Sequence, residues 1–316
     1  MDEKVKIGIS SCLLGKPVRW NAGHKLDRFL TNTLGQFVEY VPVCPEVEAG
    51  FGVPRESVRL VGDPENPRMI SFKSKTDLTD QMQGWAKKRV KELEKEDLCG
   101  FIFKCDSPSS GMIRVKVYSE KGMPRKVGVG MFARVFMDHF PRIPVEDDGR
   151  LHNPAIRENF IERIFSLKRW RDISATSPRM GKLVDFHSRN KLLLLSHSQK
   201  HYRLMGKLVA DGKKLPPEQL FDQYEHLLLE ALALKTTVKK NNNVLLHLMG
   251  YFKKQLTPDE KQELLEVFEQ YRSGHVPLLV PLTLINHYVR KYDQPYLKIQ
   301  TYLNPHPVEL RLRTSL

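Results

Sequence analysis

The chain has 316 residues, of which 41% are hydrophobic and 28% are charged. This length suggests two domains with ordinary packed cores, and no run approaches the roughly 18 apolar residues that a membrane-spanning helix needs. The first residues lead directly into a strand-like pattern, without the basic start and apolar core of a secretory signal. The sequence therefore predicts a cytoplasmic protein that is not embedded in a membrane.

The formal net charge of +14 is distributed unevenly along the chain. Residues 1–165 hold 27 Lys and Arg against 23 Asp and Glu, whereas residues 166–316 hold 24 against 14. A basic half is typical of proteins that bind a polyanion, most simply nucleic acid. The alternative is a solvated basic surface that has no such partner.

Short apolar runs alternate with helical patterns in the first half of the chain. Strands are expected within KVKIGIS, EYVPVCPE, GFIFKCDSP and MIRVKVYSEKG, the last with the period-two alternation of an edge strand. Amphipathic helices are expected at residues 79–97 and 129–140. Strands that alternate with helices favour an α/β domain with a mainly parallel sheet.

The second half has the composition of an all-α domain. Helical patterns occupy five segments, at residues 181–214, 216–234, 241–256, 257–274 and 281–292. The fourth segment opens with Thr257 as the expected N-cap and ends at Gly274, a suitable residue just beyond a helix. The segment KRWRDISATSPRM joins the two halves, and the predicted domains are residues 1–165 and 166–316.

All four cysteines lie in the first third of the chain, and three of them follow expected strands. These three are Cys12, Cys44 and Cys105. Because the carboxyl ends of parallel strands meet at one edge of a sheet, their thiols are expected to converge there. Cys99 precedes its strand and is expected to be a buried structural cysteine.

Three converging thiolates without a fourth protein ligand suggest a metal centre with one open position. Zinc held by three cysteines and a water is one possibility. A 4Fe–4S cluster with three protein-bound irons is another, and unconnected buried cysteines are a third. The spacing does not decide among them, because the chain contains no CxxC pair.

The segments around these cysteines resemble the thiouracil desulfidase family of TudS-like proteins. The first block is SSCLLGKPVRWNAGHK, the second is PVCPEVEAGFGVPRESVRL, and the third is FKCDSPSSGMIRVKVY. In the second half, LVDFHSRNKLLLLSHSQKHYRLMGKLVAD, NVLLHLMGYFKKQL, YRSGHVPLLVPLTLINHYV and YLNPHP are similar to a YbgA-like domain. The combination resembles the fused desulfidases of RudS type, which act on 4-thiouridine in tRNA.

The resemblance implies an enzyme that removes sulfur from thiolated uridine by hydrolysis, without net electron transfer. It implies a 4Fe–4S cluster with three cysteine ligands and one open iron. It also implies that Glu46 and Ser107 are catalytic. The candidate contacts to substrate are Arg19, Asn21, Arg55, Lys104, Ser109 and Ser110. For the two arginines, which suit a phosphate or a uracil oxygen, surface salt bridges are the alternative.

The third block departs from the family pattern at one position. The common block ends Ser-Pro-Ser-Cys-Gly, whereas this chain has Ser110 at the cysteine position and carries Cys105 five residues earlier. We expect Cys105 to replace the missing ligand from the other side of the turn. The alternatives are that Ser110 is a weak ligand or that the cluster has been lost.

The helical half mixes Lys and Arg with Tyr, His and Asn, as in SQKHYR, VKKNNN and YFKK. Basic residues suit phosphates, and aromatic or amide side chains suit exposed bases. This composition predicts that the helical domain binds tRNA. His187, His197 and His201 are expected to be ordinary polar or core residues rather than metal ligands, since no HExxH motif is present.

Two other functions remain open at this stage. The first is desulfidation of free thiouracil or thionucleosides, with another role for the helical domain. The second is a nucleic-acid-binding protein that contains an iron–sulfur cluster but catalyses no reaction.

Overall fold

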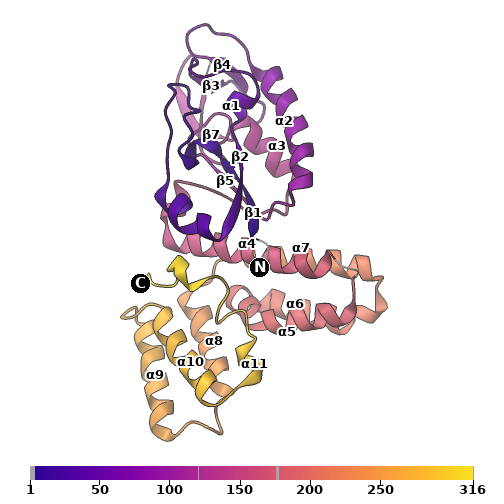
Figure 1. The fold of residues 1–316 in the computed structure, drawn as a ribbon, viewed down its shortest axis with the longest axis vertical. Coiled ribbons are helices and arrows are strands. Elements are labelled where there is room, and N and C mark those ends of the chain that lie inside the picture. Colours follow the sequence, from indigo (N-terminus) through magenta and orange to yellow (C-terminus); the bar gives the residue numbers. More distant parts are fainter. Residues whose placement is uncertain (1–3, 120, 176–177, 316) are drawn as a thin grey trace. The chain divides into compact units, whose positions relative to one another are not determined.

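The computed structural model describes residues 4–119, 121–175 and 178–315. It divides into two compact units, Met1–Asn153 and Pro154–Leu316, coloured from indigo to yellow along the chain in Figure 1. The first unit is α/β, and every regular element described in the second is a helix, so the predicted fold classes are confirmed. The expected boundary after residue 165 lies inside helix α4 (Pro154–Ser174). Residues 176 and 177 of the expected joining segment lie outside the described residues.

A four-stranded parallel sheet forms the centre of the first unit. Its strand order is β2-β1-β5-β8, with β1 next to both β2 and β5. The strands are β2 (Val38–Val43), β1 (Val5–Ser10), β5 (Phe101–Phe103) and β8 (Val145–Asp147). Since all four strands run in one direction, their carboxyl ends share one edge of the sheet.

A second sheet of the first unit has the order β4-β3-β6-β7. Its strands are β4 (Arg68–Ser71), β3 (Val58–Val61), β6 (Val115–Tyr118) and β7 (Pro124–Gly128). Strand β6 pairs in parallel with β3 and in antiparallel fashion with β7. The prediction of an edge strand here is therefore wrong: alternation reports one buried face and not the number of hydrogen-bonded neighbours.

Two helices pack against the parallel sheet, as Figure 1 shows for α2 (Thr79–Leu93) and α3 (Met131–His139). Phe101 and Phe103 of β5 contact the rings of Phe132 and Phe136 from α3. These four side chains are fully buried. The aromatic core fixes the position of α3 relative to the carboxyl end of β5. Between β2 and β3 lies the short helix α1 (Pro45–Glu48).

The second unit consists of helices α4 to α11. After α4 they are α5 (Met180–His197), α6 (Gln199–Ala210), α7 (Pro217–Ala233), α8 (Val238–Gly250), α9 (Pro258–Arg272), α10 (Leu279–Lys291) and α11 (Pro295–Lys298). The indole of Trp170 from α4 stacks on Tyr224 from α7, with ring centroids 4.9 Å apart. Both side chains are fully buried and lie at the centre of this unit.

The helical pattern of residues 181–214 forms two helices rather than one. Ser198 has extended backbone angles, with φ −158° and ψ 112°, and its hydroxyl accepts a hydrogen bond from the backbone N–H of His201. This N-cap ends α5 and starts α6. The N-cap expected at Thr257 is confirmed, because Thr257 and Glu260 form a reciprocal capping box at the start of α9. Among the described residues, no helix combines the length and the apolar character required to cross a membrane.

Candidate metal centre and active site

Three thiols line one cavity of about 440 Å³ in the first unit. They belong to Cys12, Cys44 and Cys105, the three cysteines that the sequence predicts to converge. Cys12 is buried, and the other two are half-buried. Cys99 is also buried but does not line this cavity.

The sheet topology brings the three thiols together. Cys44 directly follows β2, Cys12 lies in the 3₁₀ turn Ser11–Leu14 after β1, and Cys105 follows β5 by two residues. These are three adjacent parallel strands, so residues far apart in sequence share one edge. The turn that holds Cys12 ends at Gly15, whose φ of 83° is in the region that glycine adopts without strain.

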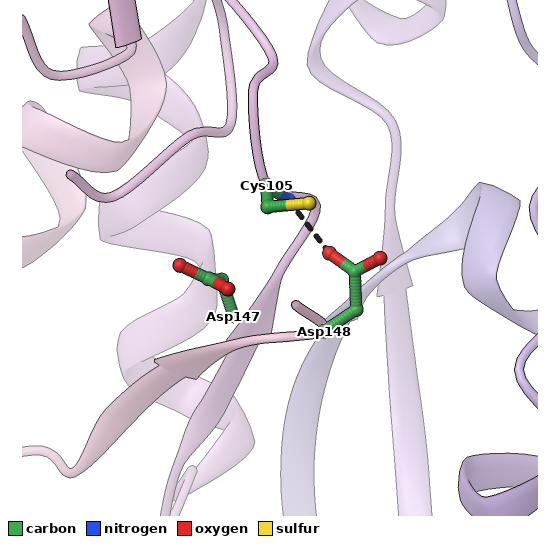
Figure 2. A group of neighbouring side chains, drawn as sticks. All are labelled: Cys105, Asp147 and Asp148. Carbon is green, nitrogen blue, oxygen red and sulfur yellow. Dashed lines mark hydrogen bonds between the residues drawn. The ribbon is translucent and has the colours of Figure 1, made fainter. Parts of the chain in front are cut away.

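Cys105 is held by a lysine and an aspartate. Lys104 Nζ lies 2.9 Å from Cys105 Sγ and 2.9 Å from Asp148 Oδ2. The backbone N–H of Cys105 donates to Asp148 Oδ1 at 2.7 Å, the contact drawn in Figure 2. Burial lowers the pKa of Lys104, but its contacts with Cys105 and Asp148 outweigh this effect and raise the pKa overall. The ammonium therefore stays charged next to the Cys105 sulfur.

Burial raises the pKa values of all three thiols of the cavity. The pKa of Cys12 is raised to about 11 from an ordinary value of 9, and those of Cys44 and Cys105 also rise. Protein groups alone therefore leave these cysteines protonated at neutral pH. A soft metal ion or cluster would supply the positive charge that thiolates need. The three sulfur donors line one cavity, but they do not all lie within 4.8 Å of one another. Because Zn–S bonds of about 2.3 Å would bring the sulfurs to roughly 3.8 Å apart, this spacing suits a larger iron–sulfur cluster with an open position better than a single zinc ion.

Oxygen and sulfur atoms of Cys105, Asp147 and Asp148 lie within 4.8 Å of one another. Figure 2 shows the two carboxylates approaching Cys105 from the end of β8. Lys104 Nζ contacts both the sulfur and the Asp148 carboxylate, whereas Asp147 Oδ1 accepts a hydrogen bond of 2.8 Å from the backbone N–H of Arg150. We conclude that Asp148 orients Lys104 and the Cys105 loop, and that Asp147 holds the turn at Arg150.

Glu46 is anchored through both carboxylate oxygens in the same cavity. Oε2 forms an ion pair with Arg55, and Oε1 accepts a hydrogen bond of 2.8 Å from Ser109 Oγ. Arg55 also donates to the carbonyl oxygens of Val18 and Gly52. Each carboxylate oxygen has a further lone pair with which to accept a proton. Glu46 is thus a fixed carboxylate whose orientation depends on Arg55 and Ser109.

Ser107 shapes the turn that follows Cys105. Its Oγ accepts hydrogen bonds from the backbone N–H groups of Ser109 and Ser110, at 3.3 and 3.1 Å, and lies 3.0 Å from Ser109 Oγ. Since Ser109 donates to Glu46, its oxygen is left to accept from the Ser107 hydroxyl. The hydroxyls therefore form a directed chain from Ser107 through Ser109 to Glu46.

The N-terminus of α3 holds this turn in place. The backbone N–H groups of Met131 and Phe132 donate to the carbonyl oxygens of Pro108 and Ser109, at 3.1 and 3.0 Å. A Cβ atom at Gly130 would lie only 2.6 Å from the Ser109 carbonyl group. Glycine is therefore needed where α3 meets the turn, and the aromatic core beneath α3 positions Ser107 and Ser109.

The candidate substrate contacts occupy different environments. Arg19 lines the cavity, and its guanidinium has no hydrogen-bond or ion-pair partner in the part of the chain that the structure describes. Arg55 and Lys104 line it too, but their polar contacts are to protein groups. Ser109 and Ser110 also line it. Asn21 is not among the lining residues; its side chain accepts from the backbone N–H of Gly23.

Three residues of the site were not predicted from the sequence. Trp20 and Lys25 line the cavity, and the Trp20 side chain is 48% exposed. Asp148 holds Lys104 and Cys105. Asp148 directly follows β8, so recognising a fourth parallel strand in PVEDDG would have placed it at the same edge. The position of Trp20 within the first block, next to Arg19, was the only signal for its role.

The three histidines singled out in the second unit make ordinary contacts. His197 Nε2 lies 3.2 Å from Glu162, which in turn pairs with the buried Arg313 at 2.7 Å. His187 contacts Tyr224, and His201 contacts Ser198. Among the described residues, the only group of three potential ligands whose atoms all lie within 4.8 Å of one another is Cys105, Asp147 and Asp148, and it contains no histidine.

Comparisons with known proteins match both units. Residues 7–148 match the model of the family described as 2-thiouracil desulfurase, and residues 191–307 match the family described as protein of unknown function DUF1722. The "Uncharacterized protein YbgA" of Escherichia coli (strain K12) is 35% identical over 154 residues, which are 48% of this chain and 91% of YbgA. A solved structure of the 4Fe–4S-dependent thiouracil desulfidase TudS is 26% identical, with a TM-score of 0.40, over 49% of this chain and 98% of that one.

These matches cover the regions in which the sequence motifs occur, and the family matches are in the expected order. The chain therefore belongs to the family of YbgA. It is a desulfidase of the thiouracil type that joins a TudS-like domain, matched by the 2-thiouracil desulfurase model over residues 7–148, to a YbgA-like domain.

Proposed function

We propose that this protein is a tRNA 4-thiouridine desulfidase, which converts thiolated uridine to uridine and releases hydrosulfide. The observation that carries the proposal is the cavity in which three thiols and the anchored carboxylate of Glu46 face the same space. A volume of about 440 Å³ is in the range of small-molecule sites. It suits a single nucleobase that has left its stack.

In this proposal Cys12, Cys44 and Cys105 hold a 4Fe–4S cluster. Bound there through three sulfurs, the cluster would present an open iron to the soft thiocarbonyl sulfur and polarise the C=S bond as a Lewis acid. Lys104, next to the Cys105 sulfur, supplies an N–H donor of the kind that tunes metal-bound thiolates. Zinc at the same three thiols is the alternative that metal analysis would distinguish.

Glu46 acts as the general base of the hydrolysis. It takes one proton from the water that attacks the ring carbon. The water oxygen becomes the carbonyl oxygen of uridine, and the sulfur leaves as hydrosulfide, so no electron is gained or lost. Ser109 and Arg55 keep the carboxylate oriented, and Ser107 orients Ser109.

The proposed partner is tRNA, bound through the basic second half. Residues 166–316 carry ten more basic than acidic residues, which suits a polyanion. A thiobase inside folded tRNA has to turn outward to enter a cavity, at a cost of a few kcal/mol. Contacts of the second unit with the tRNA backbone would offset this cost.

Sulfide release from two substrates tests the proposal. The full chain is reconstituted anaerobically with iron and sulfide, and hydrosulfide is measured with thiolated tRNA and with 4-thiouridine nucleoside. We expect kcat/KM to be much higher with tRNA, and the tRNA preference to decrease steeply as salt is raised. Equal efficiency with the nucleoside would instead assign the enzyme to free thionucleosides, and the absence of sulfide release from both would contradict the proposal.

A further inference from the structure

Two adjoining cavities lie on the second unit, separate from the thiol-lined site. One has a volume of about 350 Å³ and is bordered by residues of α5 and α6. The other, of about 340 Å³, extends from α5 and α6 to α8 and α11. They share Lys191, Tyr202 and Arg203 as lining residues. We call the two together the α5–α6 groove.

The first cavity contains a buried histidine nitrogen without a partner. His187 is 4% exposed, and its Nδ1 lies 3.1 Å from the Tyr224 hydroxyl. Its Nε2 is buried and has no hydrogen-bond partner among the described residues. Such an atom in a native protein calls for a ligand or an ordered water. His187 itself lines the cavity, so a ligand bound in the cavity would lie close to this side chain.

A glycine lies next to this nitrogen. Gly206 of α6 also lines the cavity, and a Cβ atom on it would lie 3.9 Å from His187 Nε2. This is an ordinary contact distance, so alanine fits without strain. Glycine in a helix interior costs about 0.5–1 kcal/mol relative to alanine. The fold thus carries a small cost at a position next to the histidine, where a methyl group would narrow the cavity.

The charges of the groove are all of one kind. Lys191 is half-buried, Arg203 is exposed, and neither has a hydrogen bond or ion pair in the described part of the chain. Some other basic residues of this unit are paired, such as Lys291 with Glu260 and Arg272 with Glu269. No Asp or Glu is among the described residues that line either cavity. The groove therefore suits an anion.

The second cavity adds flat aromatic surfaces. The rings of Tyr251 and Tyr296 are stacked, with centroids 5.2 Å apart and an interplanar angle of 23°. The Tyr251 side chain is 44% exposed, and His247 lines the cavity beside it. Exposed tyrosine faces stack on unpaired bases with little regard to sequence. This feature favours a nucleotide over an acidic peptide.

We propose that the α5–α6 groove binds an unpaired, phosphate-linked nucleotide of the RNA partner. One phosphate contacts Lys191, Arg203 and His187 Nε2, and the adjoining base stacks on Tyr251. The proposal rests on RNA being the partner of this protein and names the place where a single-stranded part of it binds. A strand held there gives the second unit a contact that does not depend on the thiobase.

Binding is measured by fluorescence anisotropy on the full-length chain, with two probes: unmodified tRNA and a labelled short oligouridylate. The variant Lys191→Gln/Arg203→Gln should weaken oligouridylate binding at least tenfold and reduce its salt slope by about one to two. The matched control is Lys239→Gln/Lys261→Gln, in which two exposed lysines outside both cavities lose the same charge. The control should leave oligouridylate affinity within about twofold. An equal loss of oligouridylate affinity in both double variants would overturn the proposal.

Two single variants separate stacking and the histidine from general charge. Tyr251→Ala should weaken oligouridylate binding about tenfold, whereas Tyr251→Phe should preserve it. Gly206→Ala should keep or raise the melting temperature and still weaken binding, because its methyl group would narrow the cavity next to His187 Nε2. Wild-type affinity for oligouridylate in both Gly206→Ala and Tyr251→Ala would overturn the proposal. So would a competition experiment in which polyglutamate displaces the probe as well as polyuridylate does at the same concentration of charge.

The probes also separate this proposal from the function proposed above. If tRNA binds to the wild-type chain and the groove variants bind it equally well, the groove assignment is wrong and the tRNA partner stands. If the wild-type chain binds neither tRNA nor oligouridylate, both assignments fail. A third outcome is that the groove variants lose oligouridylate binding while sulfide release shows no preference for tRNA. This outcome would support the groove as a nucleotide site and contradict tRNA as the substrate.

Discussion

Ser109 Oγ donates a hydrogen bond of 2.8 Å to Glu46 Oε1, although the two residues are 63 positions apart in the chain. The contact links the turn after β5 to the helix α1 that follows β2. It exists because β2 and β5 flank β1 in one parallel sheet. The Glu46 carboxylate is therefore oriented by a segment that also carries a metal-ligand candidate, Cys105.

Loss of this hydrogen bond should slow turnover without loss of the metal centre. Ser109→Ala is expected to lower kcat about tenfold, since a hydrogen bond to a charged group contributes roughly 1.5–3 kcal/mol. Glu46→Gln should lower kcat by about 10²–10⁴, the usual contribution of a general base. Ser119→Ala, in the turn between β6 and β7, makes the same change away from the cavity and should leave kcat unchanged. Loss of iron from Glu46→Gln would show that Glu46 is structural instead.

Cys105 should be required for the metal centre, and Cys99 should not. Cys105→Ser is expected to lose most of its iron and visible absorption after anaerobic reconstitution, because a serine hydroxyl is a poor substitute for a soft thiolate. Cys99→Ser is the matched control: Cys99 is buried but lies outside the cavity. Ser110→Ala should retain iron. If Cys105→Ser retained all of its iron, or if Ser110→Ala lost its iron, Ser110 rather than Cys105 would be the third ligand.

Trp20 should contribute to substrate binding more than to the chemical step. Its ring lines the cavity and is 48% exposed, so that it offers a face on which a uracil ring can stack. Trp20→Ala is expected to raise KM for 4-thiouridine about tenfold and to leave kcat nearly constant. Trp20→Phe should preserve most of the affinity. Steady-state sulfide release measures both constants, and a fall in kcat at unchanged KM would contradict a stacking role.

The stability of the second unit should decrease in mild acid because of His187. Burial, together with the nearby charge of Lys191, lowers the pKa of His187 to about 4 from an ordinary value of 6.5. Between these pH values the unfolded chain binds a proton that the folded chain does not. The free energy of unfolding should therefore decrease as pH falls from about 6.5 to 4, by up to about 3 kcal/mol, and level off below pH 4.

Urea unfolding at a series of pH values measures this effect. Tryptophan fluorescence reports on the second unit through Trp170, which stacks on the Tyr224 ring beside His187. In His187→Gln the free energy of unfolding should depend less on pH. In His287→Gln, a change at an exposed position of α10, this pH dependence should be the same as in the wild type. An unchanged slope in His187→Gln would place the acid sensitivity in other groups.

Local patterns in the sequence were sufficient to predict most helices and the strands that carry the cysteines. β-Branched runs that end in turns predicted β1, β2 and β5, and period-3.6 patterns with capping residues predicted α7, α9 and α10. Helix α4 was missed, because its charged residues hide the apolar positions that it buries. The break at Ser198 was missed because a single serine is compatible with a helix until its hydroxyl caps the next one.

The sequence by itself determined which thiols share an edge, because residues that directly follow parallel strands meet wherever those strands pair. It also determined the two fold classes, since period-two and period-3.6 patterns depend only on local spacing. Only the tertiary structure decided that Asp148 holds Lys104 and Cys105, that Arg55 pairs with Glu46, and that Gly206 lies next to His187. Most of these contacts join segments far apart in the chain, and all of them depend on the direction in which side chains point. Strand order and helix packing establish that direction, and local sequence patterns do not encode it.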